Sequence, residues 1–337
     1  MAYKKNDLEH SNLLRDLSGL SNKPASFDSI LEGINTVALG GHVRPDGDCV
    51  GSSMGLFLYI KKKFPEVEVD VYLEPIPEVF HLLTGTEHIQ NNVKEVKSYD
   101  LFITLDCADE ERLGFSLPLY HEAKKTLCID HHVSNTGYAD INYIAAKASS
   151  TSELVYTLLE ETFIDKNIAE CLYTGIVHDT GVFRFSSTSP ETMEIVAALL
   201  RKGVKNDEIV EKTYFERTFI QTRITGKALM DSELILDGRC IVSALNKKDM
   251  EEFGANTYDL DGIVNQLWLT KDVDVAIFLY ELETGEYKVS LRSSDKIDVS
   301  KIASVFGGGG HKKAAGFNTK EPSEHAIDLI CQELMKV

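Results

Sequence analysis

The sequence has no apolar run approaching the roughly 18 residues of a membrane span, and its start, MAYKKNDLEH, has no apolar segment of signal-peptide length. It has no CxxC pair, since its six cysteines stand singly, which is not the spacing of a zinc knuckle or a disulfide framework. Positive charge is scarce: 35 Lys+Arg against 53 Asp+Glu give a formal net charge of -18. We therefore expect a cytoplasmic protein with reduced thiols, no membrane association and a surface that repels long nucleic acids.

Internal repeats, low-complexity tracts and heptads are also absent, so the 337 residues are expected to form two ordinary domains. In the first half, short apolar strands alternate with helices, which predicts an α/β fold with a largely parallel sheet covered by helices on both faces. The domain is expected to span residues 1–188. Its expected strands are residues 35–40, 67–73, 101–105 and 126–129, and its expected helices include 50–63, 151–161 and 168–178.

From Pro190 the pattern turns helical, over residues 190–203 and then 207–230, which predicts a helical connector of residues 189–231. Strand-like runs then return and are followed by a glycine cluster and a final helix, so residues 232–337 are expected to form a second, smaller α/β domain. The strands expected in it are residues 239–245, 273–280 and 286–291.

The stretch HVRPDGDCVGS, residues 42–52, lies between a predicted strand and a predicted helix. It places His42, Asp46 and Asp48 in one turn, whose geometry Pro45 and Gly47 would set. On its own such a turn indicates little, because aspartate is common in solvated loops.

Similar side chains follow two more of the predicted strands. The run LFITL leads directly into Asp106, and TLCI leads into Asp130, His131 and His132. Asp179 follows an apolar helical stretch. Because parallel sheets bind ligands at the carboxyl ends of their strands, we expect these side chains to converge there.

Mixed imidazole and carboxylate ligands suit manganese, magnesium, cobalt or zinc. Six candidate ligands are too many for one ion and indicate two ions about 3.5 to 4 Å apart, bridged by one carboxylate, an arrangement that favours phosphate-ester hydrolysis. The rival interpretation is that the acids cap helices and the histidines pack in the core. It is less favoured because clustered carboxylates repel one another without cations.

The motifs HVRPDGD, LDCAD, DHH and HDTG, in this order, resemble those of the DHH phosphoesterase superfamily, and LRSS with FGGGGHKKAAGF resembles its DHH-associated C-terminal domain. The resemblance implies two divalent cations, most fittingly manganese, with magnesium or cobalt as alternatives. It assigns one ion to His42, Asp46 and Asp106. It assigns the other to Asp48, Asp106, His131 and Asp179, with Asp106 as the bridge.

The resemblance also implies catalytic and substrate-binding residues. His132 would face the scissile phosphate as a contact or proton donor, and Asp130 would orient a histidine ring. The second domain would bind a terminal nucleotide. Apart from the resemblance, the position of Arg184 soon after Asp179 makes it a candidate phosphate contact, or simply a solvated arginine. The residues expected to bind the terminal nucleotide are Arg292, Ser293, Gly308, Gly309, Gly310 and His311.

The GGGGH segment argues against the family II pyrophosphatases, whose C-terminal lobe differs, and length and net charge argue against the longer RecJ-type exonucleases. The resemblance therefore favours the stand-alone members of the superfamily, the nanoRNases and 3′-phosphoadenosine 5′-phosphate (pAp) phosphatases. We expect a manganese-dependent enzyme that hydrolyses very short oligoribonucleotides, and pAp to AMP. The alternatives are a phosphodiesterase for cyclic di-AMP or pApA, a single-strand exonuclease, or a nucleotide-binding protein without catalysis. The sequence leaves the oligomeric state open, including a homodimer.

Overall fold

The computed structural model describes residues 27–336. The chain divides into two units: the first ends at Glu216 and the second begins at Arg217. This division differs from the predicted boundaries at residues 188 and 231. The connector helices are shared between the units, because α7 (Pro190–Arg201) packs on α6 (Lys166–Asp179), whereas α9 (Phe219–Met230) packs on the second sheet.

The first unit contains a six-stranded, fully parallel sheet in the order β3-β2-β1-β4-β5-β6. Every pair of neighbouring strands is parallel, which confirms the predicted parallel sheet. Successive strands are added on one side of β1 as far as β3, and then on the other side from β4 to β6. Ligands of open α/β sheets bind at such a switch in strand order, here between β1 and β4. The strands are β1 (Thr36–Gly41), β2 (Glu68–Tyr72), β3 (Ile89–Gln90), β4 (Leu101–Leu105), β5 (Thr126–Asp130) and β6 (Ile141–Ile144).

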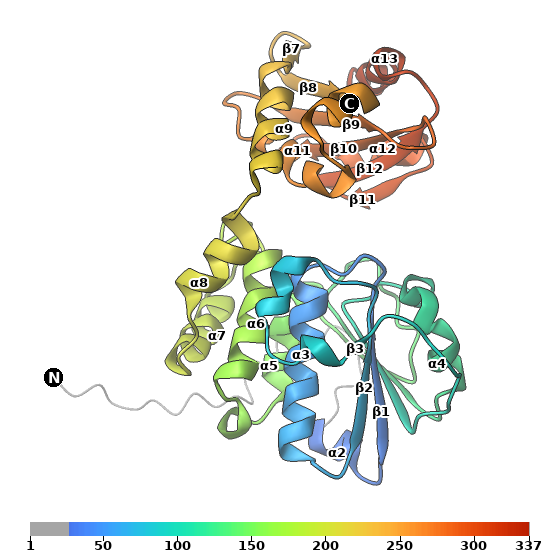
Figure 1. The fold of residues 1–337 in the computed structure, drawn as a ribbon, viewed down its shortest axis with the longest axis vertical. Helices are drawn as coiled ribbons and strands as arrows, with labels where there is room; N and C mark the ends of the chain where they lie inside the picture. Colours follow the sequence, from blue (N-terminus) through green and yellow to red (C-terminus); the bar gives the residue numbers. More distant parts are fainter. Residues whose placement is uncertain (1–26, 337) are drawn as a thin grey trace, which may run out of the picture. The chain divides into compact units, whose positions relative to one another are not determined.

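Helices cover both faces of this sheet (Figure 1). On one face, α3, α5 and α6 pack over the main apolar core, to which Val37 and Leu39 of β1 belong. The intervening Ala38 belongs to a smaller aromatic cluster on the opposite face, where η3 and α4 pack. The helices and helical turns are α2 (Phe27–Leu31), α3 (Gly47–Lys63), η1 (Glu78–Leu82), η2 (Thr86–His88), η3 (Glu110–Ser116), α4 (Leu117–Glu122), α5 (Thr151–Leu158), η4 (Glu161–Phe163), α6, α7, α8 (Asn206–Val210) and η5 (Glu211–Phe215).

The second unit is built on a mixed six-stranded sheet in the order β11-β12-β10-β9-β8-β7. Only β8 and β9 pair in parallel; the other neighbours are antiparallel. The strands are β7 (Glu233–Ile235), β8 (Cys240–Leu245), β9 (Val275–Glu281), β10 (Tyr287–Ser293), β11 (Gly309–His311) and β12 (Ala314–Thr319).

Two apolar clusters fill this unit, one on each side of β9. Ile277 and Leu279 belong to the cluster under α12 and α13, and Ala276 and Phe278 belong to the cluster under α9 and α11. This alternation is that of a strand covered on both faces. The helices are α9, α10 (Lys247–Phe253), η6 (Thr257–Leu260), α11 (Ile263–Trp268), α12 (Val299–Val305) and α13 (Ser323–Leu334).

Across residues 27–336, no helix combines the length and the apolar character that crossing a bilayer requires. Five of the six cysteines are buried and all six are free thiols. The cytoplasmic location expected from the sequence stays a prediction.

Candidate functional site

Three neighbouring strands bring the predicted ligands to one edge of the first sheet. His42 follows β1, Asp106 follows β4, and Asp130 ends β5 directly before His131. Gly41 pairs with Leu105 and Leu105 pairs with Ile129, so the three strands end nearly level. The convergence that the sequence predicted for parallel strands is therefore present.

The turn after β1 is shorter than expected, because α3 begins at Gly47 rather than at Val50. The Asp46 carboxylate caps the helix by accepting hydrogen bonds from the N–H groups of Asp48 (3.1 Å) and Cys49 (3.2 Å). Gly47 serves packing as well as turn geometry, since a Cβ there would collide with the His178 ring. Asp46 thus combines the capping role of the rival interpretation with a place among the candidate ligands.

His42, Asp46 and Asp106 form one group of candidate ligands. The His42 Nε2 atom lies 3.7 Å from Oδ1 of Asp46 and 3.5 Å from Oδ2 of Asp106. One ligand atom from each of the three residues lies within 4.8 Å of the others. This is the set that the resemblance assigned to one ion.

Asp48, His131 and Asp179 form a second group with the same spacing. The His131 Nε2 atom lies 2.9 Å from Oδ2 of Asp179 and 4.0 Å from Oδ2 of Asp48. It also lies 3.5 Å from Oδ1 of Asp106. The two oxygens of Asp106 therefore face different groups, which is the geometry that a bridging carboxylate requires.

The backbone of Asp106 adopts a left-handed conformation, with φ of 54°. Left-handed φ is uncommon outside glycine, although aspartate tolerates it better than most residues. Residues held in this region often lie at functional sites. The conformation is consistent with a carboxylate held in place for binding.

Both ring orientations fit metal binding. The His42 Nδ1 atom lies 2.9 Å from the Val43 carbonyl oxygen, and the His131 Nδ1 atom lies 3.3 Å from that of Ala148. A proton on Nδ1 donated to a backbone carbonyl leaves Nε2 with its lone pair free, as in most histidine metal ligands.

His132 points to a different partner. Its Nδ1 atom lies 2.8 Å from Oδ1 of Asp130, which is fully buried. Oδ2 of Asp130 accepts a hydrogen bond from the Asn135 amide at 2.7 Å, and this amide also bonds to the Cys107 carbonyl. Asn135 was not predicted from the sequence, where its place three residues after the DHH triplet is the only signal.

The charges in the cluster shift several pKa values. Burial raises the pKa of Asp48 well above its usual range, and the charges of Asp106 and Asp179 add to the effect. Burial also raises the pKa of Asp179, to about 6, against the opposing influence of His131. Burial alone would lower the pKa of His42, but hydrogen bonds to Asp106 and Asp46 outweigh it and raise the value to about 10.

These shifts share one physical cause. Buried, closely spaced carboxylates disfavour further negative charge and are stabilised by positive charge nearby. Divalent cations would supply that charge, and imidazole with carboxylate is a donor set that they accept. The residues present therefore fit a centre for two divalent cations.

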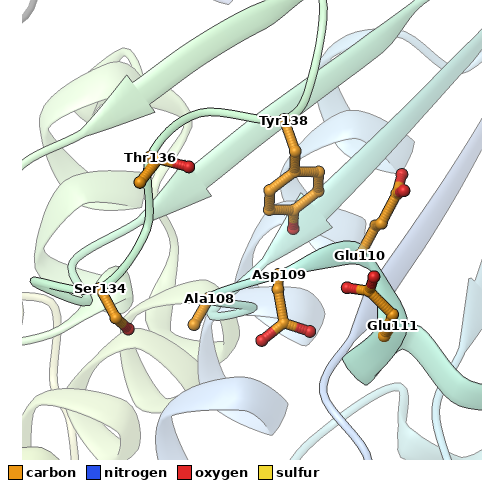
Figure 2. A pocket seen from close by; sticks show the side chains of 7 residues that line it. All are labelled: Ala108, Asp109, Glu110, Glu111, Ser134, Thr136 and Tyr138. Atoms are coloured by element: carbon orange, nitrogen blue, oxygen red, sulfur yellow. The ribbon is translucent and has the colours of Figure 1, made fainter.

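A pocket of about 300 Å³ is lined by residues that follow Asp106 and His132 in the chain (Figure 2). Carboxylates come from the loop after β4 and from the start of η3, and hydroxyls come from the loop after β5. None of its lining residues is basic, so the lining offers no countercharge to a phosphate. The lining residues are Ala108, Asp109, Glu110, Glu111, Ser134, Thr136 and Tyr138.

Of the residues expected to bind substrate in the second unit, Arg292 is held in a defined orientation. Its Nε atom donates to Oδ1 of Asn265 at 2.8 Å, and Nη1 donates to the Leu291 carbonyl at 2.9 Å. Asn265 was not among the residues predicted from the sequence.

Ser293 does not match its expected role. It is 3 % exposed, and its hydroxyl lies 2.7 Å from the Ile297 carbonyl and 3.2 Å from the Lys312 carbonyl. The hydroxyl therefore ties β10 to the following loop. This correction follows from burial, which the sequence did not reveal.

The glycine cluster contributes an edge strand rather than only a loop. Gly309–His311 forms β11, which pairs with β12 at the end of the second sheet. A Cβ at Gly308 would collide with the Gly316 carbonyl, and Gly310 has φ of 140°. Close packing thus explains Gly308, and the positive φ explains Gly310. Because β11 is the edge strand, the backbone groups on its outer side have no partner strand in this sheet.

Arg184 lies on the exposed turn after α6, and its N–H donates to the Thr180 carbonyl at 2.9 Å. His178, which precedes Asp179 in the chain, lies 2.9 Å from the Thr213 hydroxyl and packs edge-on against Phe80. The structure thus gives His178 a packing role and leaves that of Arg184 a prediction.

Comparison with protein families finds two matches in this chain. Residues 36–176 match the DHH family, N-terminal domain, and residues 237–336 match the DHHA1 domain. Both matches fall within the structural units that divide at residue 216. They confirm the resemblance that the motifs indicated.

Similar proteins extend over most of the chain. A bifunctional oligoribonuclease and PAP phosphatase NrnA from Thermus thermophilus is 29% identical, covering 88% of this chain and 89% of its own length. The protein of the same name from Bacillus subtilis is 28% identical, covering 89% of this chain and 96% of its own length. The crystal structure of an exopolyphosphatase-related protein from Bacteroides fragilis is 29% identical, with a TM-score of 0.87 over 92% of this chain and 94% of that one.

Proposed function

Because the chain belongs to the DHH family of phosphoesterases, with a DHHA1 domain after its DHH domain, we propose that it hydrolyses very short oligoribonucleotides to mononucleotides and pAp to AMP. The observation that carries the proposal is Asp106, whose two oxygens face two separate groups of candidate ligands. The names of the two NrnA relatives support the choice of substrates.

The proposed cofactors are two manganese ions, with magnesium or cobalt as alternatives. One would be held by His42, Asp46 and Asp106. The other would be held by Asp48, Asp106, His131 and Asp179. Such ions lower the pKa of water and offset charge on phosphoryl oxygens.

Two further side chains of the centre, His132 and Asp130, are proposed to act in proton transfer and in orienting the imidazole ring. Burial lowers the pKa of His132, but the hydrogen bond to Asp130 outweighs it and raises the pKa above its usual range. Asp130 engages Nδ1 of the ring and so fixes its orientation. We assign His132 as the proton donor to the leaving oxygen, and Asp130 as the carboxylate that keeps the ring charged and oriented.

The second unit is proposed to bind the terminal nucleotide. Arg292 and His311 would supply positive charge and donors, and the backbone of Gly308, Gly309 and Gly310 would supply N–H groups. Ser293 is left out of this set because its hydroxyl is engaged internally. Arg184 is retained as a candidate contact from the first unit.

Cyclic di-AMP and pApA remain candidate substrates of the same chemistry, while the net charge of -18 weighs against long strands. A panel of substrates separates these possibilities. The full-length protein, loaded with manganese, is incubated with pAp, pApA, cyclic di-AMP, RNA of two to five nucleotides, a long single-stranded DNA and pyrophosphate, and kcat/KM is compared.

We expect the highest kcat/KM for the short RNAs, with turnover of pAp. Preference for the long DNA would contradict the proposed substrate size. Preference for pyrophosphate would contradict the proposed role of the second unit, and nucleotide binding without hydrolysis would contradict catalysis altogether.

A further inference from the structure

Thr151, the first residue of α5, touches two of the candidate metal ligands at once. Its hydroxyl donates to Oδ1 of Asp106 at 3.1 Å, and its backbone N–H donates to Oδ2 of Asp48 at 2.6 Å. The residue is fully buried. We propose that Thr151 is a positioning residue that fixes the spacing of the Asp48 and Asp106 carboxylates for metal binding.

The start of α5 is well suited to this task. The first N–H groups of a helix have no partner within the helix and carry partial positive charge. In α5, the N–H groups of Thr151 and Ser152 both point to the Asp48 carboxylate, the second at 2.9 Å. The next N–H, that of Glu153, is capped by the Ser150 hydroxyl at 3.0 Å. The helix therefore holds each oxygen of Asp48 by one hydrogen bond.

These bonds leave acceptor capacity for cations. Each oxygen of a carboxylate has two lone pairs, so the Asp48 oxygens keep one apiece after accepting the two N–H groups. Asp106 receives the Thr151 hydroxyl on Oδ1 only, and its Oδ2 lies 3.5 Å from His42 Nε2. Thr151 can thus orient both carboxylates without displacing a metal ion from them.

The helix that carries Thr151 is itself anchored. The buried Glu153 carboxylate accepts hydrogen bonds from the hydroxyls of Ser149 (2.5 Å) and Thr192 (2.7 Å). Thr192 belongs to the capping box with Ser189 at the start of α7. The position of Thr151 is therefore fixed from two helices, so that its hydroxyl and N–H act as a rigid spacer.

The inference deepens the proposed function and rests on it, because it concerns the binding of the same metal ions. Thr151 lies outside the four motifs of the first domain. Residues that hydrogen-bond to metal ligands typically change metal affinity or activity about 10- to 100-fold when they are replaced. We expect an effect of this size from the loss of a single hydroxyl.

The test compares Thr151→Val, which keeps the shape but removes the hydroxyl, with Thr151→Ser, which keeps the hydroxyl. Thr174→Val is the matched control, because Thr174 is also fully buried but donates its hydroxyl to the Glu170 carbonyl within α6. Manganese binding to the metal-free, full-length proteins is measured by calorimetry and by the EPR signal of free Mn²⁺, without any substrate. Turnover of a ribodinucleotide is then followed as a function of manganese concentration.

We expect Thr151→Val to weaken manganese binding at least about 10-fold, while Thr151→Ser and Thr174→Val stay close to wild type. Equal binding by folded Thr151→Val and wild type overturns the inference. If Thr151→Val does not fold, Thr151→Ser and Thr151→Ala form a second pair that differs only in the hydroxyl. Equal manganese affinities of these two variants would also overturn the inference. If the wild type itself binds no manganese, the proposed cofactor is contradicted. This result differs from equal binding by wild type and Thr151→Val, which contradicts the role of Thr151.

Discussion

The Nδ1 atom of His132 lies 2.8 Å from Oδ1 of the fully buried Asp130. Asp130→Asn keeps the size of this partner but removes its charge, so the pKa of His132 should fall. We expect kcat near neutral pH to drop about 10- to 100-fold, and the alkaline limb of the kcat profile to move to lower pH, because a proton donor loses activity above its pKa.

The matched control for this pair is Asp140→Asn. Asp140 accepts hydrogen bonds from the N–H and hydroxyl of Thr126 at the opposite end of β5. Its replacement should leave the shape of the pH profile unchanged. A wild-type profile in Asp130→Asn would remove Asp130 from the assigned role.

Arg292 is predicted to bind the phosphate or sugar of the terminal nucleotide. Arg292→Ala should weaken substrate binding by about 1.5 to 3 kcal/mol, and Asn265→Ala by about 0.5 to 1.5 kcal/mol, since Asn265 acts only through the arginine. KM for a ribodinucleotide is the measurement. Arg239→Ala, which breaks a pair with Asp274 in the same unit, serves as the control, and an unchanged KM in Arg292→Ala would contradict the assignment.

Gly175 lets α6 approach Asp48 closely. A Cβ at this position would lie 2.6 Å from Oδ1 of Asp48 and would collide with the Ser152 hydroxyl. Gly175→Ala should therefore lower the free energy of unfolding by about 1 to 3 kcal/mol and weaken manganese binding. In Gly226→Ala, within α9, the new Cβ meets nothing within 4 Å, so this control should gain about 0.5 to 1 kcal/mol. Equal effects of the two substitutions in urea titrations would contradict the packing argument.

Asp100 is predicted to stabilise the first unit in a pH-dependent way. A hydrogen bond from Lys124 and the N–H groups of Asn35 and Thr36 lower the pKa of Asp100 to about 2, below the 3.8 of an unperturbed aspartate. Its contribution is therefore present above about pH 4 and is lost as the pH falls toward 2. Asp100→Asn should cost about 1 kcal/mol at pH 7 and less at pH 3.

Urea titrations at the two pH values test this prediction, with Glu95→Gln as a control that removes the same charge from an exposed loop residue. A difference between wild type and Asp100→Asn that stays constant from pH 7 to pH 3 would contradict the assigned pKa.

Much of the first unit was predictable from local patterns. The apolar runs of β1, β4 and β5 end directly at His42, Asp106 and Asp130, so a parallel sheet brings these residues to one edge. Strands β3 and β6 were missed for physical reasons. The first has only two residues, and the second is half-buried at the edge of the sheet, which leaves no clear apolar period.

Contacts between distant segments were beyond local patterns. Thr151 meets Asp48 across 103 positions of the chain, and Asn265 meets Arg292 across 27. The engaged hydroxyl of Ser293 and the pairing of the glycine cluster in β11 likewise depend on tertiary packing. Residue types predicted which candidate ligands come together, whereas the structure was needed to find what orients them.

The most direct test of the account is metal-dependent turnover by the wild type and Asp106→Ala. Both proteins are stripped of metal, reloaded with manganese and assayed on a ribodinucleotide. We predict that the wild type hydrolyses it only with manganese, and that Asp106→Ala, which lacks the carboxylate facing both ligand groups, loses at least about 100-fold in kcat/KM. Metal-independent turnover, or wild-type activity in Asp106→Ala, would contradict the two-metal centre.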